Sequence, residues 1–248
     1  MIMMIEEYIK RNIDAQLIAW KEDTMRKPLL LRGARQVGKS SAIRNFGKQF
    51  KYFAEVNFER NKAVKTFFHG DIDVRLIVEK ISTYINVPIE AGNTLLFFDE
   101  IQECPEALMA LRFFKEEYPE LHVVAAGSLL EFALQELPTF GVGRIHSLFM
   151  YPMTFDEFLF ANHEDGLVKI RDGAYGKQPV EQVFHDKLVE YFRTYLLVGG
   201  MPESVLAWIR THDFTRCRNI QEDIVLTYED DFSKYKKRVN PDLLRTTM

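Results

Sequence analysis

The chain has 248 residues with a formal net charge of −4, and its 47% hydrophobic content is enough for a large core. No apolar run approaches the ~20 residues that a membrane-spanning helix needs, and the slight acidity does not indicate a nucleic-acid-binding protein. The two cysteines, Cys104 and Cys217, lie far apart, which argues against a disulfide framework or a zinc site and predicts a reducing, cytoplasmic compartment.

The first 150 residues alternate between expected helices and strands. The chain opens with an expected helix over 5–22, which carries apolar residues on one stripe. The expected strands cover 28–31, 52–58, 94–98, 121–126 and 145–150, and the helices between them include those starting at 41, 73 and 105. Apolar strands that alternate with helices indicate an α/β fold with a parallel five-stranded sheet covered on both faces.

After residue 153 the pattern becomes helical. Helices are expected over 154–163, 180–197, 203–210 and 214–232. Segment 169–179, rich in glycine and charge, is expected to be an exposed loop, and the aromatic-rich segment 149–160 is expected to belong to the core. The change of period divides the chain into an α/β domain over 1–152 and an all-helical subdomain over 153–232.

Residues 33–40 form a complete phosphate-loop motif, G-x-x-x-x-G-K-[ST], between an apolar strand and a helix. Gly33 and Gly38 let the backbone wrap around phosphate oxygens. Lys39 is expected to reach the β- and γ-phosphates, and the Ser40 hydroxyl to ligate Mg²⁺. The other expected nucleotide contacts come from Ala34, Arg35, Gln36, Val37 and Ser41. The alternative, a glycine turn with a chance lysine, is disfavoured by the strand before the loop, so the sequence predicts a nucleoside-triphosphate-binding protein.

A second chemical signal is the run over 95–100, in which four apolar residues are followed by Asp99 and Glu100. The end of a buried parallel strand lies at the carboxyl edge of its sheet, where ligands bind in open α/β folds. There we expect Asp99 to hold the Mg²⁺ shell and Glu100 to activate the attacking water. Two adjacent carboxylates favour a hydrolase over a small-molecule kinase.

Four further segments follow the phosphate loop in order: T-L-L-F-F-D-E-I-Q-E-C-P over 94–105, A-A-G-S-L-L-E over 125–131, V-G-R-I over 142–145 and Y-P-M-T-F-D-E-F-L over 151–159. The series resembles a poorly characterised prokaryotic group of AAA-superfamily P-loop ATPases that carry an additional C-terminal domain of unknown function. The resemblance covers roughly residues 8–232. It implies ATP and ADP as ligands, and a core in which one strand lies between the Walker A and Walker B strands.

Relatives in that group usually continue beyond the point where this chain stops. Residues 233–248 are therefore expected to begin a linker to a missing C-terminal domain, which would be a partner in cis.

Three further site residues follow from the resemblance. Ser128 matches the polar sensor of the γ-phosphate, with a helix N-cap as the alternative. Arg144 precedes the fifth strand, where an arginine finger would reach a neighbouring subunit, with an ordinary exposed basic residue as the alternative. Pro202, in G-G-M-P over 199–202, matches a proline that lies against adenine from a helical lid. The alternative there is a glycine helix end followed by a proline helix start.

Two functions fit these features. The first is Mg²⁺-dependent ATP hydrolysis used as a slow, nucleotide-driven conformational switch, acting on the C-terminal domain or a protein partner. The alternative is a DNA-associated motor or loader stimulated by nucleic acid, whose oligomeric subunits complete one another's sites. The basic cluster over 234–238 is compatible with phosphate-backbone contact, but a solvated helix face or linker is the favoured interpretation. The presence of Glu100 disfavours a binding module without chemistry, and no membrane partner is expected.

Overall fold

The computed structural model describes residues 8–128, 130 and 143–234. Its contacts divide the chain into two compact units, Met1–Tyr151 and Pro152–Met248. The expected linker after residue 234 lies outside the described residues, and so does all of the basic cluster except Lys234.

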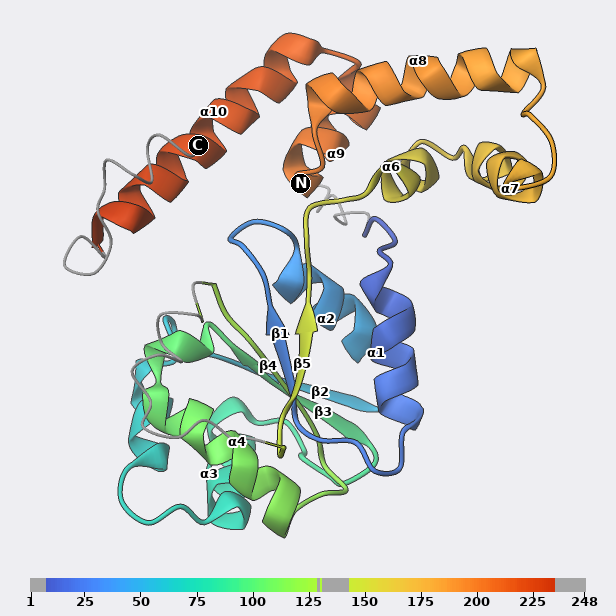
Figure 1. The fold of residues 1–248 in the computed structure, drawn as a ribbon. Helices are drawn as coiled ribbons and strands as arrows, with labels where there is room; N and C mark the ends of the chain where they lie inside the picture. The colour runs from blue at the N-terminus through green and yellow to red at the C-terminus, as the bar shows by residue number, and fades with distance from the viewer. Residues whose placement is uncertain (1–7, 129, 131–142, 235–248) are drawn as a thin grey trace. The chain divides into compact units, whose positions relative to one another are not determined.

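The first unit is built on five parallel strands in the order β2-β3-β4-β1-β5 (Figure 1). The strands are β1 (Leu29–Arg32), β2 (Tyr52–Asn57), β3 (Thr94–Asp99), β4 (His122–Ala126) and β5 (His146–Phe149). The predicted α/β fold with a parallel five-stranded sheet is thereby confirmed. The implied strand order is confirmed as well, because β4 pairs with both β1 and β3.

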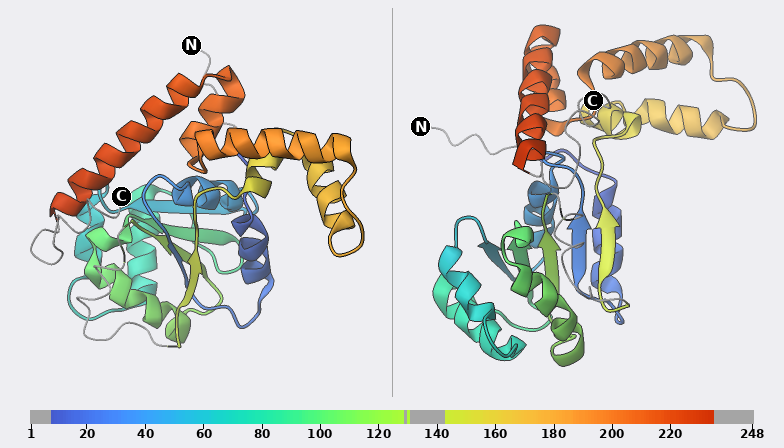
Figure 2. Two further views of the ribbon diagram at one scale, coloured as in Figure 1. Left: turned by 45° about the horizontal axis from the view of Figure 1, so that its top comes forward. Right: turned by 60° about the vertical axis from the view of Figure 1, so that its left-hand side comes forward.

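Helices cover both faces of this sheet, with α1 and α2 on one side and α3 and α4 on the other (Figures 1 and 2). These helices are α1 (Ile13–Glu22), α2 (Lys39–Gly47), α3 (Val74–Ile85) and α4 (Pro105–Glu117), and the 3₁₀ turns are η1 (Lys62–Phe68) and η2 (Ile101–Glu103). Every residue of β3 and β4 is buried, which explains why both strands are nearly continuous apolar runs. The buried β3 carries its last residue, Asp99, to the carboxyl edge of the sheet.

The start of the chain differs from the expected helix over 5–22. Among the described residues, the helix begins at Ile13 and residues 8–12 are not helical. In this segment Arg11 is only 5% exposed, and its guanidinium donates to main-chain carbonyls elsewhere in the unit. In this non-helical segment the Arg11 guanidinium therefore points into the first unit.

The second unit consists of helices throughout its described part, as predicted. They are α6 (Phe155–Ala161), α7 (Asp165–Ala174), α8 (Gln182–Val198), α9 (Pro202–Thr211) and α10 (Phe214–Lys234). The Thr154 hydroxyl accepts from the Glu157 amide while the Glu157 carboxylate accepts from the Thr154 amide, which fixes the start of α6. No helix in the described ranges is long and apolar enough to cross a membrane.

The prediction of an exposed loop over 169–179 was wrong for its first half, because α7 continues to Ala174. Leu167 and Val168 are buried against Leu159 of α6, with Phe184 and Leu188 packed around them. Burial of this apolar face stabilises a helix that its glycines would otherwise disfavour.

The expectation that the aromatic residues over 149–160 form core was also partly wrong. Phe158 is fully buried, whereas Phe149 is 46% and Tyr151 68% exposed. The two exposed rings stack on each other with centroids 6.5 Å apart, and the Arg32 guanidinium lies 4.8 Å from the Phe149 centroid. Phe149 belongs to β5, which among the described strands pairs with β1 alone, so its side chains receive less cover than those of the central strands.

Candidate active site

The phosphate loop connects the end of β1 to the start of α2. Gly33 has φ +147° and Gly38 has φ +97°, backbone conformations that favour glycine. A Cβ atom on Gly33 would lie 2.2 Å from the Met150 carbonyl oxygen, so this glycine also permits the loop to pack on the backbone after β5. Gly38 occupies the position just before α2, which directs the first amide groups of that helix into the loop.

Lys39 is the first residue of α2 and is only 8% exposed. Its Nζ donates to the carbonyl oxygens of Gly33 at 2.9 Å and Ala34 at 2.8 Å, which holds the ammonium group across the loop. Burial lowers the pKa of Lys39 to about 8, although the negative charges of Glu100 and Asp99 oppose that shift. At neutral pH the loop therefore holds a buried positive charge, a strong attractor of phosphate.

The remaining loop residues differ in exposure. Val37 is buried and Arg35 half-buried, while Ala34, Gln36 and Ser41 are exposed. The positive charge of Arg35 is among the causes that lower the pKa of Lys39, so the two cations lie near each other.

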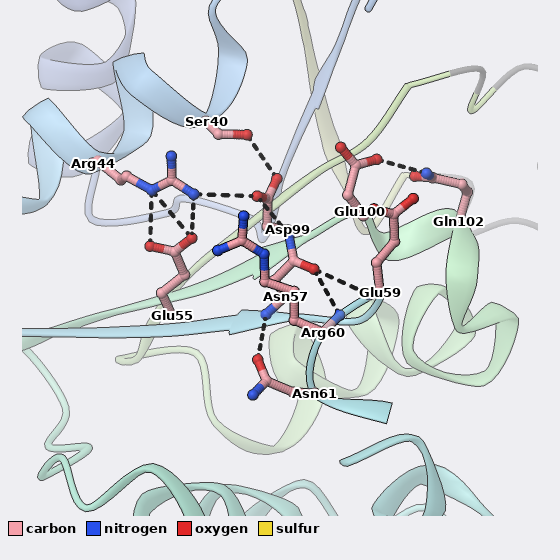
Figure 3. Close-up of polar contacts among 10 residues, drawn as sticks. All are labelled: Ser40, Arg44, Glu55, Asn57, Glu59, Arg60, Asn61, Asp99, Glu100 and Gln102. Atoms are coloured by element: carbon pink, nitrogen blue, oxygen red, sulfur yellow. Dashed lines mark hydrogen bonds and ion pairs between the residues drawn. The ribbon is translucent and has the colours of Figure 1, made fainter. Parts of the chain in front are cut away.

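Asp99 lies at the centre of a hydrogen-bonded group (Figure 3). The Ser40 hydroxyl donates to its Oδ1 at 2.8 Å, and the Asn57 amide donates to its Oδ2 at 3.1 Å. The Arg44 guanidinium lies 3.6 Å from the same Oδ2 and also pairs with Glu55 at 2.6 Å. Burial raises the pKa of Asp99, opposed chiefly by the hydrogen bond from Ser40. Asp99 is thus held by donors from α2 and from the end of β2.

Asn57 and Arg44 were not predicted as site residues. Asn57 is the last residue of β2 and pairs in register with Asp99. Its side-chain oxygen accepts from the Glu59 and Arg60 amides, both at 3.1 Å. Because its amide is held from both ends, Asn57 can fix the orientation of Asp99. The sequence shows a polar residue at the end of an expected strand, but it does not show that this residue pairs with Asp99.

Glu100 follows directly in a left-handed backbone conformation, φ +51°. Its Oε2 accepts a 2.6 Å hydrogen bond from Nε2 of Gln102, which lies in the η2 turn (Figure 3). Ser128, two residues beyond the end of β4, is 2% exposed, and its hydroxyl has no hydrogen-bond partner among the described residues. Asp99, Glu100 and Ser128 therefore all lie at or just beyond the carboxyl ends of the neighbouring strands β3 and β4, but the Ser128 hydroxyl makes no hydrogen bond to either acid.

The chemistry of Ser40 and Asp99 fits Mg²⁺. A hydroxyl and a carboxylate are hard oxygen ligands, and their side-chain oxygens lie 2.8 Å apart. No group of three His, Cys, Asp or Glu residues in the described part of the chain could hold a metal on its own. Mg²⁺ commonly takes one or two protein oxygens together with substrate phosphates and water, so this pair suits a metal that arrives with a nucleotide.

A buried arginine supports the phosphate loop from behind. Arg11 Nη1 donates to the Val37 carbonyl at 2.8 Å, and its Nη2 donates to the Tyr151 carbonyl at 2.7 Å. One guanidinium therefore joins the phosphate loop to the last residue of the first unit. No local pattern indicates this role of Arg11, because its partners are main-chain atoms distant in the chain.

Arg144 lies apart from these residues. It precedes β5, and β5 runs parallel to β1, so Arg144 is at the amino edge of the sheet while the phosphate loop is at the carboxyl edge. Its Nε pairs with Glu116 Oε1 at 2.6 Å, and its side chain is 53% exposed. Its predicted role as a finger toward a neighbouring subunit stays a prediction.

Pro202 belongs to the second unit, where it opens α9. Gly199, with φ +72°, ends α8, and a Cβ on Gly200 would lie 2.3 Å from the Met153 carbonyl oxygen. The structural alternative for this G-G-M-P segment is therefore observed, and the contact of Pro202 with adenine stays a prediction.

Two family models match the chain. Residues 25–159, more than half of the chain, match the model of the AAA domain. Residues 189–248 match a domain of unknown function, DUF8612. This second match begins within α8, so it overlaps the helical subdomain that was predicted over 153–232. No protein among those with curated descriptions matches the chain.

Several solved structures are similar to the chain at low sequence identity. The Walker-type ATPase PABY2304 of Pyrococcus abyssi superimposes with a TM-score of 0.55 at 16% identity, over 94% of this chain and 78% of that one. A structure of Drosophila ORC bound to DNA gives a TM-score of 0.48 at 13% identity, over 86% of this chain and 66% of that one. PCH-2 of C. elegans gives 0.46 at 12% identity, over 84% and 65%.

Proposed function

The chain belongs to the AAA domain family, and from that premise we propose that it binds ATP with Mg²⁺, hydrolyses it, and uses the nucleotide cycle as a conformational switch. The observation that carries the proposal is the 2.8 Å hydrogen bond between Ser40 and Asp99, beside the buried ammonium of Lys39. It joins the two motifs that were predicted separately, 59 residues apart.

Binding rests on the loop and on Lys39. The amides at the start of α2 and the ammonium group attract the phosphates. The two carbonyl oxygens that now accept from Lys39 Nζ hold it in reach of an incoming phosphate oxygen. Mg²⁺, when bound with the nucleotide, neutralises charge that develops on the phosphates. Ser40 and Asp99 would hold it, with Asn57 keeping the carboxylate of Asp99 oriented.

Hydrolysis requires a base for the attacking water. Glu100 is adjacent to the metal-binding carboxylate and close enough to Lys39 for its charge to raise the pKa of that lysine. In this proposal Glu100 accepts the water proton as the oxygen attacks the γ-phosphorus and the bond to the ADP leaving oxygen breaks. Lys39 stabilises the charge on the transferred phosphoryl group.

The proposed switch role is supported by the contacts between the phosphate loop and residues 150 and 151. Gly33 packs on the Met150 carbonyl, and Arg11 bridges Val37 to Tyr151. Residues 150 and 151 lead directly into the second unit, which begins at Pro152. A change in the loop on nucleotide exchange would therefore act on the segment that connects the two units.

The test combines turnover with binding. Glu100→Gln should retain ATP affinity and lose turnover by about a hundredfold or more, since it removes the base but keeps the shape. Lys39→Ala should lose binding itself, whereas Lys48→Ala, an exposed lysine at the end of α2, serves as the matched control. Wild-type turnover in Glu100→Gln would contradict the assignment of Glu100 as the base.

The same hydrolysis assay, repeated with single- and double-stranded DNA, separates the switch from the alternative predicted from the sequence. Slow turnover that DNA leaves unchanged supports the switch. Stimulation of several fold by DNA would overturn it in favour of the motor or loader.

A further inference from the structure

The two ends of the Gln102 side-chain amide lie in different environments. Its Nε2 donates a 2.6 Å hydrogen bond to Glu100, whereas its Oε1 is buried and has no hydrogen-bond partner among the described residues. A carboxylate can only accept, so the nitrogen end of the amide must face Glu100. A buried oxygen without a hydrogen-bond partner destabilises the folded state. Among the described residues, the side chain of Gln102 therefore makes one hydrogen bond, and its partner is Glu100.

The backbone around the pair is fixed. Glu100 has a left-handed conformation, and Gln102 lies in the short 3₁₀ turn that follows. Ile101, between them, is fully buried and belongs to the main core cluster. Because Ile101 anchors the turn, Gln102 has a defined position from which to hold the Glu100 carboxylate.

The oxygen end of the amide is placed by Gly127. A Cβ atom at this glycine, which follows β4, would lie 2.1 Å from Oε1 of Gln102, while the next contact is Leu130 at 3.2 Å. The φ angle of Gly127 is not in the positive range, so its backbone conformation does not require glycine. Glycine suits this position because the Gln102 amide occupies the space that a side chain at position 127 would fill.

We propose that Gln102 is a positioning residue for Glu100, and that Gly127 is needed because it leaves room for the Gln102 amide. The proposal rests on the proposed function, in which Glu100 is the base. The amide restrains one carboxylate oxygen, so that the other is presented to the attacking water in a defined orientation. Gln102 thus links the end of β3 to the end of β4, the two strands whose carboxyl ends carry Glu100 and Ser128.

The first test separates hydrogen bonding from packing. Gln102→Met keeps the length of the side chain but removes the donor, so kcat should fall about tenfold or more while KM and ADP affinity stay unchanged. An unchanged thermal midpoint with ADP bound would show that packing is retained. Gln49→Met, at an exposed glutamine outside the site, is the matched control.

The second test uses Gly127. Gly127→Ala should reproduce the loss in kcat, because its methyl group displaces the flexible end of Gln102 rather than backbone. In the double variant Gln102→Ala with Gly127→Ala, the displaced amide no longer exists. The double variant should therefore have the kcat of Gln102→Ala alone, a non-additivity that a general packing defect would not produce.

Two outcomes would overturn the proposal: wild-type kcat in Gln102→Met, or multiplying losses in the Gly127 double variant. Both are distinguishable from failure of the proposed function. If Glu100→Gln turns over at the wild-type rate, the base itself is misassigned. If Glu100→Gln is inactive while Gln102→Met is fully active, only the positioning role fails.

Discussion

Asp99 and Glu100 are neighbours in sequence but have opposite surroundings. Asp99 is 4% exposed, and its two oxygens are held by Ser40, Asn57 and Arg44. The partner of Glu100 is Gln102, whose other end is unpartnered among the described residues. The half assigned to metal binding is thus preorganised by protein groups. In the half assigned to chemistry, the carboxylate of Glu100 receives one hydrogen bond, from Gln102.

The largest effect is expected from a variant that removes the hydrogen-bonded carboxylate of Asp99. Asp99→Asn removes the negative charge and replaces one of the two oxygens that accept from Ser40 and Asn57 with an amide nitrogen, which can only donate. We expect Mg²⁺-dependent ATP affinity to fall about a hundredfold, measured by calorimetric titration with Mg²⁺ and again with EDTA. Affinity should differ little between the two conditions in the variant. If Asp99→Asn binds ATP with the Mg²⁺ dependence of the wild type, the metal-binding role of Asp99 is refuted.

An intermediate effect concerns pH. Burial lowers the pKa of Lys39 to about 8 in the free protein, so the ammonium is protonated below that pH and loses its proton above it. Since phosphate binding needs the charge, ATP affinity should decrease above pH 8 by up to about tenfold per pH unit. Lys39→Arg keeps its charge throughout this range and should bind with no such decrease. A wild-type affinity that stays constant from pH 7 to pH 9.5 would contradict this assignment.

The smallest expected effect compares two serines. Ser40→Ala removes a donor from the buried Asp99 and should lower the free energy of unfolding by about 1–2 kcal/mol. Ser128→Ala removes a buried hydroxyl that has no partner among the described residues, and should leave stability unchanged or raise it by up to about 1 kcal/mol. Urea titrations of both nucleotide-free variants measure the difference. Equal destabilisation by both would remove the proposed contrast between the two halves of the site.

The sequence was sufficient for the parts of the site that are local. The phosphate loop is a contiguous motif, and Asp99 and Glu100 end an apolar strand. Asn57 depends instead on the register between β2 and β3, which places it opposite a residue 42 positions away. No pattern near Asn57 reveals that pairing, so its contact with Asp99 could be found only from the folded chain.

The wrong predictions about the fold also have non-local causes. The glycines of α7 suggested a loop, but contacts of Leu167 and Val168 with Leu159 decided the outcome. Phe149 and Tyr151 suggested core, but β5 pairs on one side only. Tertiary packing overrode local propensity in both places. Strands β1, β3 and β4 were predicted well because burial on both faces makes each a nearly continuous apolar run.

The bridge made by Arg11 has a consequence for how the protein folds. Its two acceptors lie 26 and 140 residues away in the chain, so the loop gains its full support only when both ends of the first unit have come together. Contacts of such long range form late, because closing the intervening chain costs entropy. During synthesis, the eight residues of the motif emerge early, yet this support of the loop is complete only after Tyr151 has been made.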